Sequence, residues 1–263
     1  MRTAIKAHGL GVVMALVLTL FLWVDATWAA SAGPFSCGDN GATCSLTNVV
    51  GDSGSSLTWA NPTNAQVSDN VYAAKTLTGA ICQLDRNPFR KFVTELFTIP
   101  VAEAVGSNVT EYLQAYGFGF SVPSGATIDG ILAEIEKLDS AGGGAGLDFG
   151  VRLVVNGTID GATNDRSDTA AWPSVDGYVS HGGATDLWGH TDLTSTNVSA
   201  ANFGVAIAAQ RDCGVSDTVG LRIDHIRITV YYTPAAATPP TETPVSGTRS
   251  PSGGAAYGAP SSY

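Results

Sequence analysis

The sequence predicts an all-β domain built as an antiparallel β-sandwich. Two runs carry the prediction, residues 117–122 and 131–136, and a turn at residues 123–125 separates them. In each run apolar side chains occupy every second position, which is the pattern of a strand with one buried face. Similar runs recur between turn residues along the rest of the chain. This spacing is typical of two antiparallel sheets that share one core.

The N-terminal segment, residues 1–32, has the pattern of a secretory signal peptide. Two basic residues precede an apolar run at residues 10–23, and a stretch of small residues follows it. The apolar run is shorter than the roughly 20 residues of a membrane-spanning helix, so an uncleaved anchor is the weaker alternative. We expect cleavage near Ala32, with Ala29 and Ala30 as alternative sites. The mature chain is then extracellular or at the cell surface, without a transmembrane segment.

Charge and motifs exclude several classes of function. The chain of 263 residues has 13 basic and 23 acidic residues and a net charge of −10. An acidic chain without a basic stripe is repelled by phosphate backbones, so we predict no nucleic-acid partner. No nucleophile elbow and no phosphate-binding loop occur. Glu134 and Glu136 are expected to lie on a solvated strand face, and we predict that the protein is not an enzyme.

The four cysteines all follow the predicted signal peptide. An even number of cysteines in an exported chain favours disulfides over free thiols. Cys37 and Cys44 enclose a loop rich in Gly and Asx residues that could close a small ring, so we predict this pair. Cys82 and Cys213 remain as the second pair. A metal site is disfavoured because the close cysteine spacing of zinc sites is missing.

The first half of the folded domain is predicted to contain one interruption. Residues 33–56 are rich in Gly, Ser, Asn and Thr and are interpreted as a flexible lead-in, so the domain spans residues 57–233. A strand is expected within residues 71–77. Residues 80–106 then break the alternation, because apolar residues recur at helical spacing: Phe89, Phe92, Val93, Leu96 and Phe97. This amphipathic helix either packs on the sandwich, which we favour, or docks to a partner or membrane surface.

The second half is predicted to contain three further strands and a tail. Residues 151–155 alternate and precede Asn156-Gly157, a dipeptide that favours a tight hairpin turn. Residues 203–207 form the next run. In residues 221–232 the apolar phase changes at Asp224-His225, which predicts a β-bulge. Residues 234–263 are rich in Pro, Thr, Ser and Gly and are expected to form a flexible tail.

The order of these features resembles a known module. The matching segments are Trp59-Ala-Asn-Pro, Ser68-Asp-Asn, residues 112–131, Asp186-Leu-Trp-Gly, Asn202-Phe-Gly-Val and residues 224–232. Together they are similar to a jelly-roll-like β-sandwich module that recurs in uncharacterised secreted bacterial proteins and in phage structural proteins. The resemblance covers residues 57–233 and implies a jelly-roll fold without assigned catalytic residues. In that module a short link replaces residues 80–106, which therefore look like an insertion.

Two groups of side chains have the chemistry of metal ligands. The first offers oxygen atoms suited to calcium, although turn formation also explains it: Asp160, Asn164, Asp165 and Asp168. A calcium site near Asp69-Asn70 is the alternative. The second offers the ligand types of a zinc site but no helix that would hold them at fixed spacing: His181, Asp186 and His190.

Two hypotheses for the function follow. The first is a structural or adhesive surface protein that associates with itself or with a surface partner, for example as the subunit of an extracellular filament or virion assembly. The helix at residues 80–106 and the lead-in are its expected assembly elements. The second is a carbohydrate-binding module in which Trp172, Tyr178 and Trp188 form an aromatic platform. These aromatics instead pack beneath loops if they follow the usual behaviour of large apolar side chains.

Overall fold

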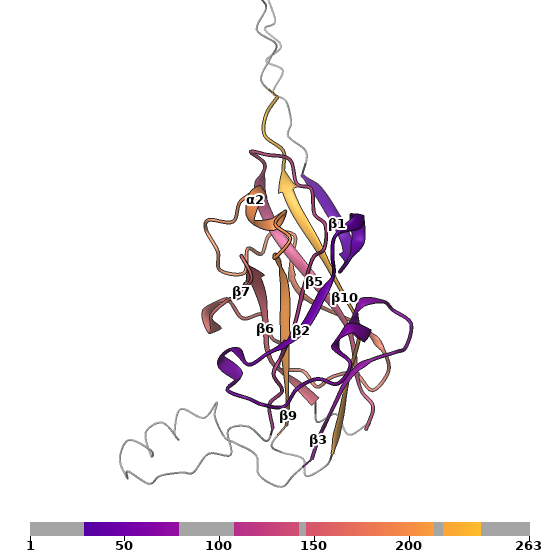
Figure 1. The fold of residues 1–263 in the computed structure, drawn as a ribbon. Helices are drawn as coiled ribbons and strands as arrows, with labels where there is room; N and C mark the ends of the chain where they lie inside the picture. The colour runs from indigo at the N-terminus through magenta and orange to yellow at the C-terminus, as the bar shows by residue number, and fades with distance from the viewer. Residues whose placement is uncertain (1–28, 79–107, 142–145, 213–217, 238–263) are drawn as a thin grey trace, which may run out of the picture.

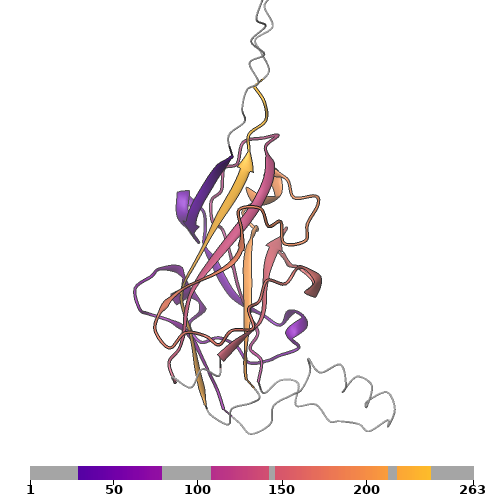
Figure 2. The same cartoon turned by 180° about the vertical axis from the view of Figure 1, so that it is seen from behind.

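A computed structural model describes residues 29–78, 108–141, 146–212 and 218–237 (Figure 1). These residues form two antiparallel sheets with only short helical turns between the strands, so the all-β prediction is confirmed. The ribbon views from opposite sides show both sheets running along the long axis of the molecule (Figures 1 and 2). Over the described ranges, none of the helices is long and apolar enough to cross a bilayer.

The first sheet contains the longest strands. Its order is β1 (Ala30–Ser36), β10 (Val219–Thr233), β5 (Thr127–Asp139) and β8 (Gly177–Gly183). The short strand β3 (Ala73–Leu77) pairs with the first part of β10, on the edge where β1 pairs with its last part. Every pairing in this sheet is antiparallel.

The second sheet has the order β2 (Ser45–Val49), β4 (Tyr112–Tyr116), β9 (Gly204–Arg211), β6 (Gly146–Val155) and β7 (Thr158–Ile159). Its pairings are antiparallel as well. In the described connections lie five short helical elements: η1 (Asp39–Gly41), η2 (Gly51–Ser53), η3 (Pro62–Gln66), η4 (Ala162–Asn164) and α2 (Ser195–Val198).

The core lies between the inner faces of the two sheets. Every second residue of β5 from Ile131 to Ile135 is fully buried, as the alternation in the sequence predicts. These side chains belong to one apolar cluster with Val151 and Leu153 of β6 and Ile207 of β9. Burial of this apolar area, about 25 cal/mol per Å², is the main favourable contribution to folding.

Two predicted local features are confirmed. Asn156 and Gly157 both adopt positive φ, at 54° and 79°, and connect β6 to β7 as a tight hairpin. The pairing of β10 with β5 shifts register between Ile223 and His225, which is the predicted bulge. Ile223 and Ile226 both lie in the core cluster, so the extra residue restores the inward phase farther along the strand.

The strand predicted at residues 117–122 is wrong in its local conformation. β4 ends at Tyr116, and the backbone continues outside any ladder. Gly117 and Gly119 adopt left-handed φ values of 89° and 70°, which a regular strand excludes. A Cβ at Gly117 would lie 2.1 Å from the carbonyl oxygen of Thr43. The apolar residues of the run are nevertheless buried: Phe118, Phe120 and Val122.

The predicted flexible lead-in, residues 33–56, is also wrong. It includes most of β1 and all of β2, which pair with β10 and β4. The predicted Cys37–Cys44 disulfide is confirmed. It links the residue after β1 to the residue before β2. The polar composition of residues 33–56 gives no sign of these strands, because the strands that pair with them lie far away in the sequence. The sandwich therefore begins at Ala30, before the predicted boundary at residue 57.

Several predictions fall outside the described residues. They are the helix at residues 80–106 with its five apolar positions, the Cys82–Cys213 pair, most of the predicted signal peptide and most of the tail.

Candidate functional site

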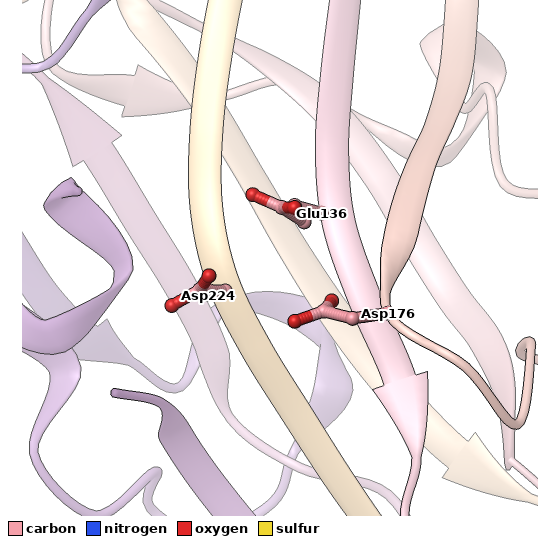
Figure 3. A group of neighbouring side chains, drawn as sticks. All are labelled: Glu136, Asp176 and Asp224. Carbon is pink, nitrogen blue, oxygen red and sulfur yellow. The ribbon is translucent and has the colours of Figure 1, made fainter. Parts of the chain in front are cut away.

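Three carboxylates converge on the outer face of the first sheet. Glu136, Asp176 and Asp224 each place an oxygen atom within 4.8 Å of the others (Figure 3). Glu136 belongs to β5, Asp224 to β10, and Asp176 directly precedes β8. Residues from three parts of the sequence thus form one cluster, which we call the carboxylate cluster.

The register of the sheet explains the arrangement. Glu136 lies between His225 of β10 and Tyr178 of β8, its partners on the two neighbouring strands. The bulge before His225 brings Asp224 next to the same face, where a regular strand would direct alternate residues to opposite faces. The prediction that Glu134 and Glu136 share the outer face of a strand is confirmed, and both side chains are partly exposed.

Asp224 is the most buried member, with 1 % of its surface exposed. Its carboxylate accepts the backbone N–H of Asn70 at 3.0 Å and lies 3.5 Å from that of Asp69. Burial raises the pKa of Asp224, and the charges of Glu136 and Asp176 raise it further, whereas the two backbone N–H groups lower it.

Tyr72 closes the cluster on the side of Asp176. Its hydroxyl donates to Asp176 Oδ2 at 2.9 Å. Burial and this hydrogen bond raise the pKa of Tyr72 to about 12, so the hydroxyl remains a donor at neutral pH.

Two oxygen atoms of the cluster are buried without a hydrogen-bond partner, Glu136 Oε2 and Asp176 Oδ1. The nearby guanidinium of Arg227 donates no hydrogen bond to either oxygen atom, because it forms a bidentate pair with Glu134 at 2.9 Å and lies over the ring of Tyr178. Its charge attracts that of Glu136 without direct contact. Unpaired carboxylate oxygens in a water-poor site are costly. Several carboxylate oxygens around one point are the ligand set that calcium and other hard cations take. These residues could therefore hold such an ion.

The oxygen ligands predicted between residues 160 and 168 do not form a cluster within the described part of the chain. Asp160 pairs with His190 at 2.6 Å. Asp165 accepts the backbone N–H groups of Val151 and Ser167, and Asp168 accepts that of Ala170. Asp165 and Asp168 thus organise local turns, which is the alternative explanation for clustered Asp and Asn. Asn164 Oδ1 accepts the hydroxyl of the neighbouring Thr163. The alternative calcium location near Asp69-Asn70 lies next to the carboxylate cluster, since the backbone N–H groups of both residues face Asp224.

The three candidate zinc ligands are separated by their partners. His181 bonds to the carbonyl oxygen of Arg166 through Nδ1. Asp186 forms a bidentate pair with the Arg166 guanidinium at 2.6 and 2.8 Å. The third, His190, pairs with Asp160. Asp186 therefore fixes the loop after β8, and the pair with Arg166 holds the pKa of that carboxyl below its ordinary value.

The predicted aromatic platform is wrong for two of its three members. Trp172 and Trp188 are 3 % and 0 % exposed. Trp172 stacks on Trp59, and the indole N–H of Trp188 donates to the backbone oxygen of Ile131. Buried rings cannot stack on a sugar. Tyr178 is partly exposed, and its hydroxyl lies 2.7 Å from His225 Nδ1.

A second polar group lies inside the sandwich, and the sequence interpretation missed it. Lys137, Asp148 and His181 are 1 %, 2 % and 3 % exposed. Lys137 Nζ lies 2.6 Å from Asp148 Oδ1 and 3.4 Å from His181 Nε2. One signal was available: Lys137 continues the inward phase of β5 after Ile135, so the alternation places a charge in the core.

Comparison with protein-family models, with curated proteins and with solved structures gave no match.

Proposed function

We propose that the protein is an exported structural or adhesive surface protein that is attached at one end and presents the other end to its partners. The observation that carries this proposal is the pairing of Ala30 with Tyr232. Because β1 begins where β10 ends, the chain enters and leaves the sandwich side by side at one end (Figure 1). We call this end the tail pole. A domain that is attached through its tail pole leaves the opposite end of the sandwich free to contact partners.

Three pairs of strand ends lie at the opposite end, which we call the loop pole. Leu77 pairs with Val219, Asp139 with Leu221, and Gly146 with Arg211. The described strand ends that flank residues 79–107, 142–145 and 213–217 therefore lie together at this pole. Connections of a rigid scaffold are where binding residues concentrate. This polarity supports a function in attachment or assembly through the loop pole.

We also propose that the fold is a jelly roll. The orders β1-β10-β5-β8 and β4-β9-β6-β7 support it, since they match an eight-stranded double sheet with two Greek keys. In this assignment β2 and β3 are additional edge strands. The jelly roll occurs in viral capsid and lectin domains, which agrees with a structural or adhesive role.

The test compares the two poles of the full-length secreted protein. Arginines replace three exposed residues of the loop pole in one variant: Thr78, Ala141 and Thr218. The matched control is Ser124→Arg, an exposed substitution in the turn that precedes β5 at the tail pole. We expect wild type and control to assemble with rising concentration in sedimentation velocity and negative-stain microscopy, and the loop-pole variant to remain monomeric. A wild-type protein that stays monomeric and does not bind to the surface of the cells that secrete it contradicts the proposal.

A second proposal concerns the carboxylate cluster, which we infer binds a divalent cation such as calcium. The two buried and unpartnered oxygen atoms, Glu136 Oε2 and Asp176 Oδ1, carry it. An ion there would neutralise the mutual repulsion and brace three segments of the first sheet.

Calcium is expected to raise the melting temperature of the chelator-treated wild type. The double variant Glu136→Gln/Asp176→Asn should melt at the same temperature with and without calcium. The matched control is Glu134→Gln, on the same strand face but outside the cluster, which should keep the calcium response. Calorimetric titration of the wild type without detectable calcium binding contradicts the proposal.

A further inference from the structure

Lys137 and Asp148 lie in contact inside the sandwich, on strands of different sheets. Lys137 extends from β5 of the first sheet and Asp148 from β6 of the second. Their side chains are 2 % and 1 % exposed, and Lys137 Nζ lies 2.6 Å from Asp148 Oδ1. The indole ring of Trp172 covers the ammonium group at 4.9 Å. Nucleophile and carboxyl group are therefore held at contact distance in a site without access from solvent.

His181 is oriented to take a proton from the lysine. Its Nδ1 lies 2.9 Å from the carbonyl oxygen of Arg166, which can only accept, so Nδ1 carries the proton. Nε2 then presents its lone pair to Lys137 Nζ at 3.4 Å and lies 3.9 Å from Asp148 Oδ2. Burial holds the pKa of His181 below its ordinary value, which keeps the ring in this neutral form.

Two N–H groups hold the carboxyl group of Asp148. The indole N–H of Trp172 donates to Oδ1 at 2.8 Å, and the backbone N–H of Asp168 donates to Oδ2 at 3.1 Å. Donors fixed on both oxygens stabilise the negative charge that develops when a nucleophile adds to the carboxyl carbon. The site thus combines a nucleophile, an electrophile, a base and oxyanion donors.

We propose that Lys137 and Asp148 condense to an intramolecular amide that joins the two sheets. This inference goes beyond the proposed function and does not depend on it. One proton passes from the ammonium group to the carboxylate, which leaves a neutral amine and a carboxylic acid. Nζ attacks Cγ and the Nζ–Cγ bond forms. A second proton passes from Nζ through His181 Nε2 to one carboxyl oxygen, the Cγ–O bond breaks, and water leaves.

The dry surroundings favour this step. Burial lowers the pKa of Lys137 and outweighs the opposing effect of Asp148, so the amine form is accessible. A buried ion pair bears the desolvation cost of both charges, whereas an amide carries none. The step needs no oxidant, reductant or cofactor, because the only other product is water.

The test is peptide mapping of the full-length purified protein under denaturing conditions. A protease that cleaves before aspartate cuts at Asp139, which lies between the two partners in the sequence. We expect one branched species with the summed mass of both peptides less one water. Two separate peptides with unmodified Lys137 and Asp148 from folded wild type overturn the proposal.

Four variants separate the amide from an ordinary ion pair. Asp148→Asn should still link but lose ammonia in place of water, so its mass deficit changes. Lys137→Arg keeps the charge and should give no linked species. His181→Gln should link roughly tenfold or more slowly, and an unchanged rate overturns the role of the ring. In the control Arg152→Lys an amine faces Asp52, which is 49 % exposed, and no link is expected there.

Discussion

At the residue scale, contacts with segments that are distant in sequence constrain single residues such as Gly117 and Asp224. Gly117 begins the crossing from β4 toward β5 in a left-handed conformation and lies against the backbone of Thr43. Asp224 is buried, and its carboxylate accepts the backbone N–H of Asn70 from a loop that is distant in sequence. Both positions are therefore sensitive to single substitutions that alter no apolar surface.

Gly117→Ala is expected to destabilise the protein by roughly 2–4 kcal/mol, because the new Cβ combines left-handed strain with a backbone clash. The matched control is Gly177→Ala in β8, where a Cβ meets nothing within 4 Å and φ is not positive. This control should remain within about 0.5 kcal/mol of wild type. Urea denaturation followed by fluorescence measures both, and equal effects contradict the assignment of strain to Gly117.

Asp224→Asn is expected to stabilise the chelator-treated protein at neutral pH. The pKa of Asp224 is raised, so the folded state binds the proton more tightly than the unfolded state does. The resulting stabilisation is complete below the ordinary value of 3.8 and is lost as the pH rises through the raised pKa. An asparagine at this position does not ionise, so the variant does not lose stability as the pH rises through this range. Its side-chain oxygen can still accept the N–H of Asn70.

Melting temperatures between about pH 4 and 7 check this sign. The advantage of Asp224→Asn should be smallest at the acidic end and increase toward neutral pH. An advantage that decreases with rising pH shows that the backbone hydrogen bonds to Asp224 outweigh burial and the repulsion within the carboxylate cluster.

At the element scale, the positions of β1 and β2 depend on one strand pairing each and on the disulfide between them. Among the described strands, each borders one neighbour along the order of its sheet. The disulfide between Cys37 and Cys44 closes the loop that connects them, and Cys37 is 2 % exposed. The backbone N–H of Ser36 also donates to Asp39 within this loop. A short ring and a local hydrogen bond thus constrain the connection between two edge strands that belong to different sheets.

Replacing Cys37 and Cys44 together by serine should cost about 2–3 kcal/mol, because the open loop gives the unfolded chain more conformational freedom. Thermal denaturation of the oxidised wild type and the double variant measures the loss. Reductant should lower the stability of the wild type toward that of the variant. A variant as stable as the oxidised wild type contradicts this role.

At the scale of the whole molecule, the start of the first sheet bears on the predicted cleavage of the signal peptide. β1 begins at Ala30, and Ala32 pairs with Val230 and packs against the core. Cleavage after Ala32 would remove three residues of this strand, whereas cleavage after Ala29 would leave it complete. Of the cleavage sites predicted from the sequence, the one after Ala29 is therefore compatible with a complete β1.

N-terminal sequencing of the exported protein is expected to begin at Ala30. A mature chain that begins at Gly33 would lack the first three β1 pairs with β10, and it contradicts this prediction. A protein that retains residues 1–29 after expression in a secreting host contradicts export by cleavage.

The sequence by itself determined the β class, the β5 strand, the hairpin at Asn156-Gly157, the bulge at Asp224-His225 and the Cys37–Cys44 pair. Each depends on local properties: alternation along one strand, the backbone preference of a dipeptide, a change of phase, or a short ring. Such properties are properties of neighbouring residues, so they are visible in a linear pattern.

Only the tertiary structure decided which residues meet. It gave the polar residues 33–56 their strand partners, buried Trp172 and Trp188, and gathered Glu136, Asp176 and Asp224 from three segments. It also brought Lys137 against Asp148 across the two sheets. These contacts depend on strand order, register and burial, which are set by pairings between distant segments and have no counterpart in local spacing.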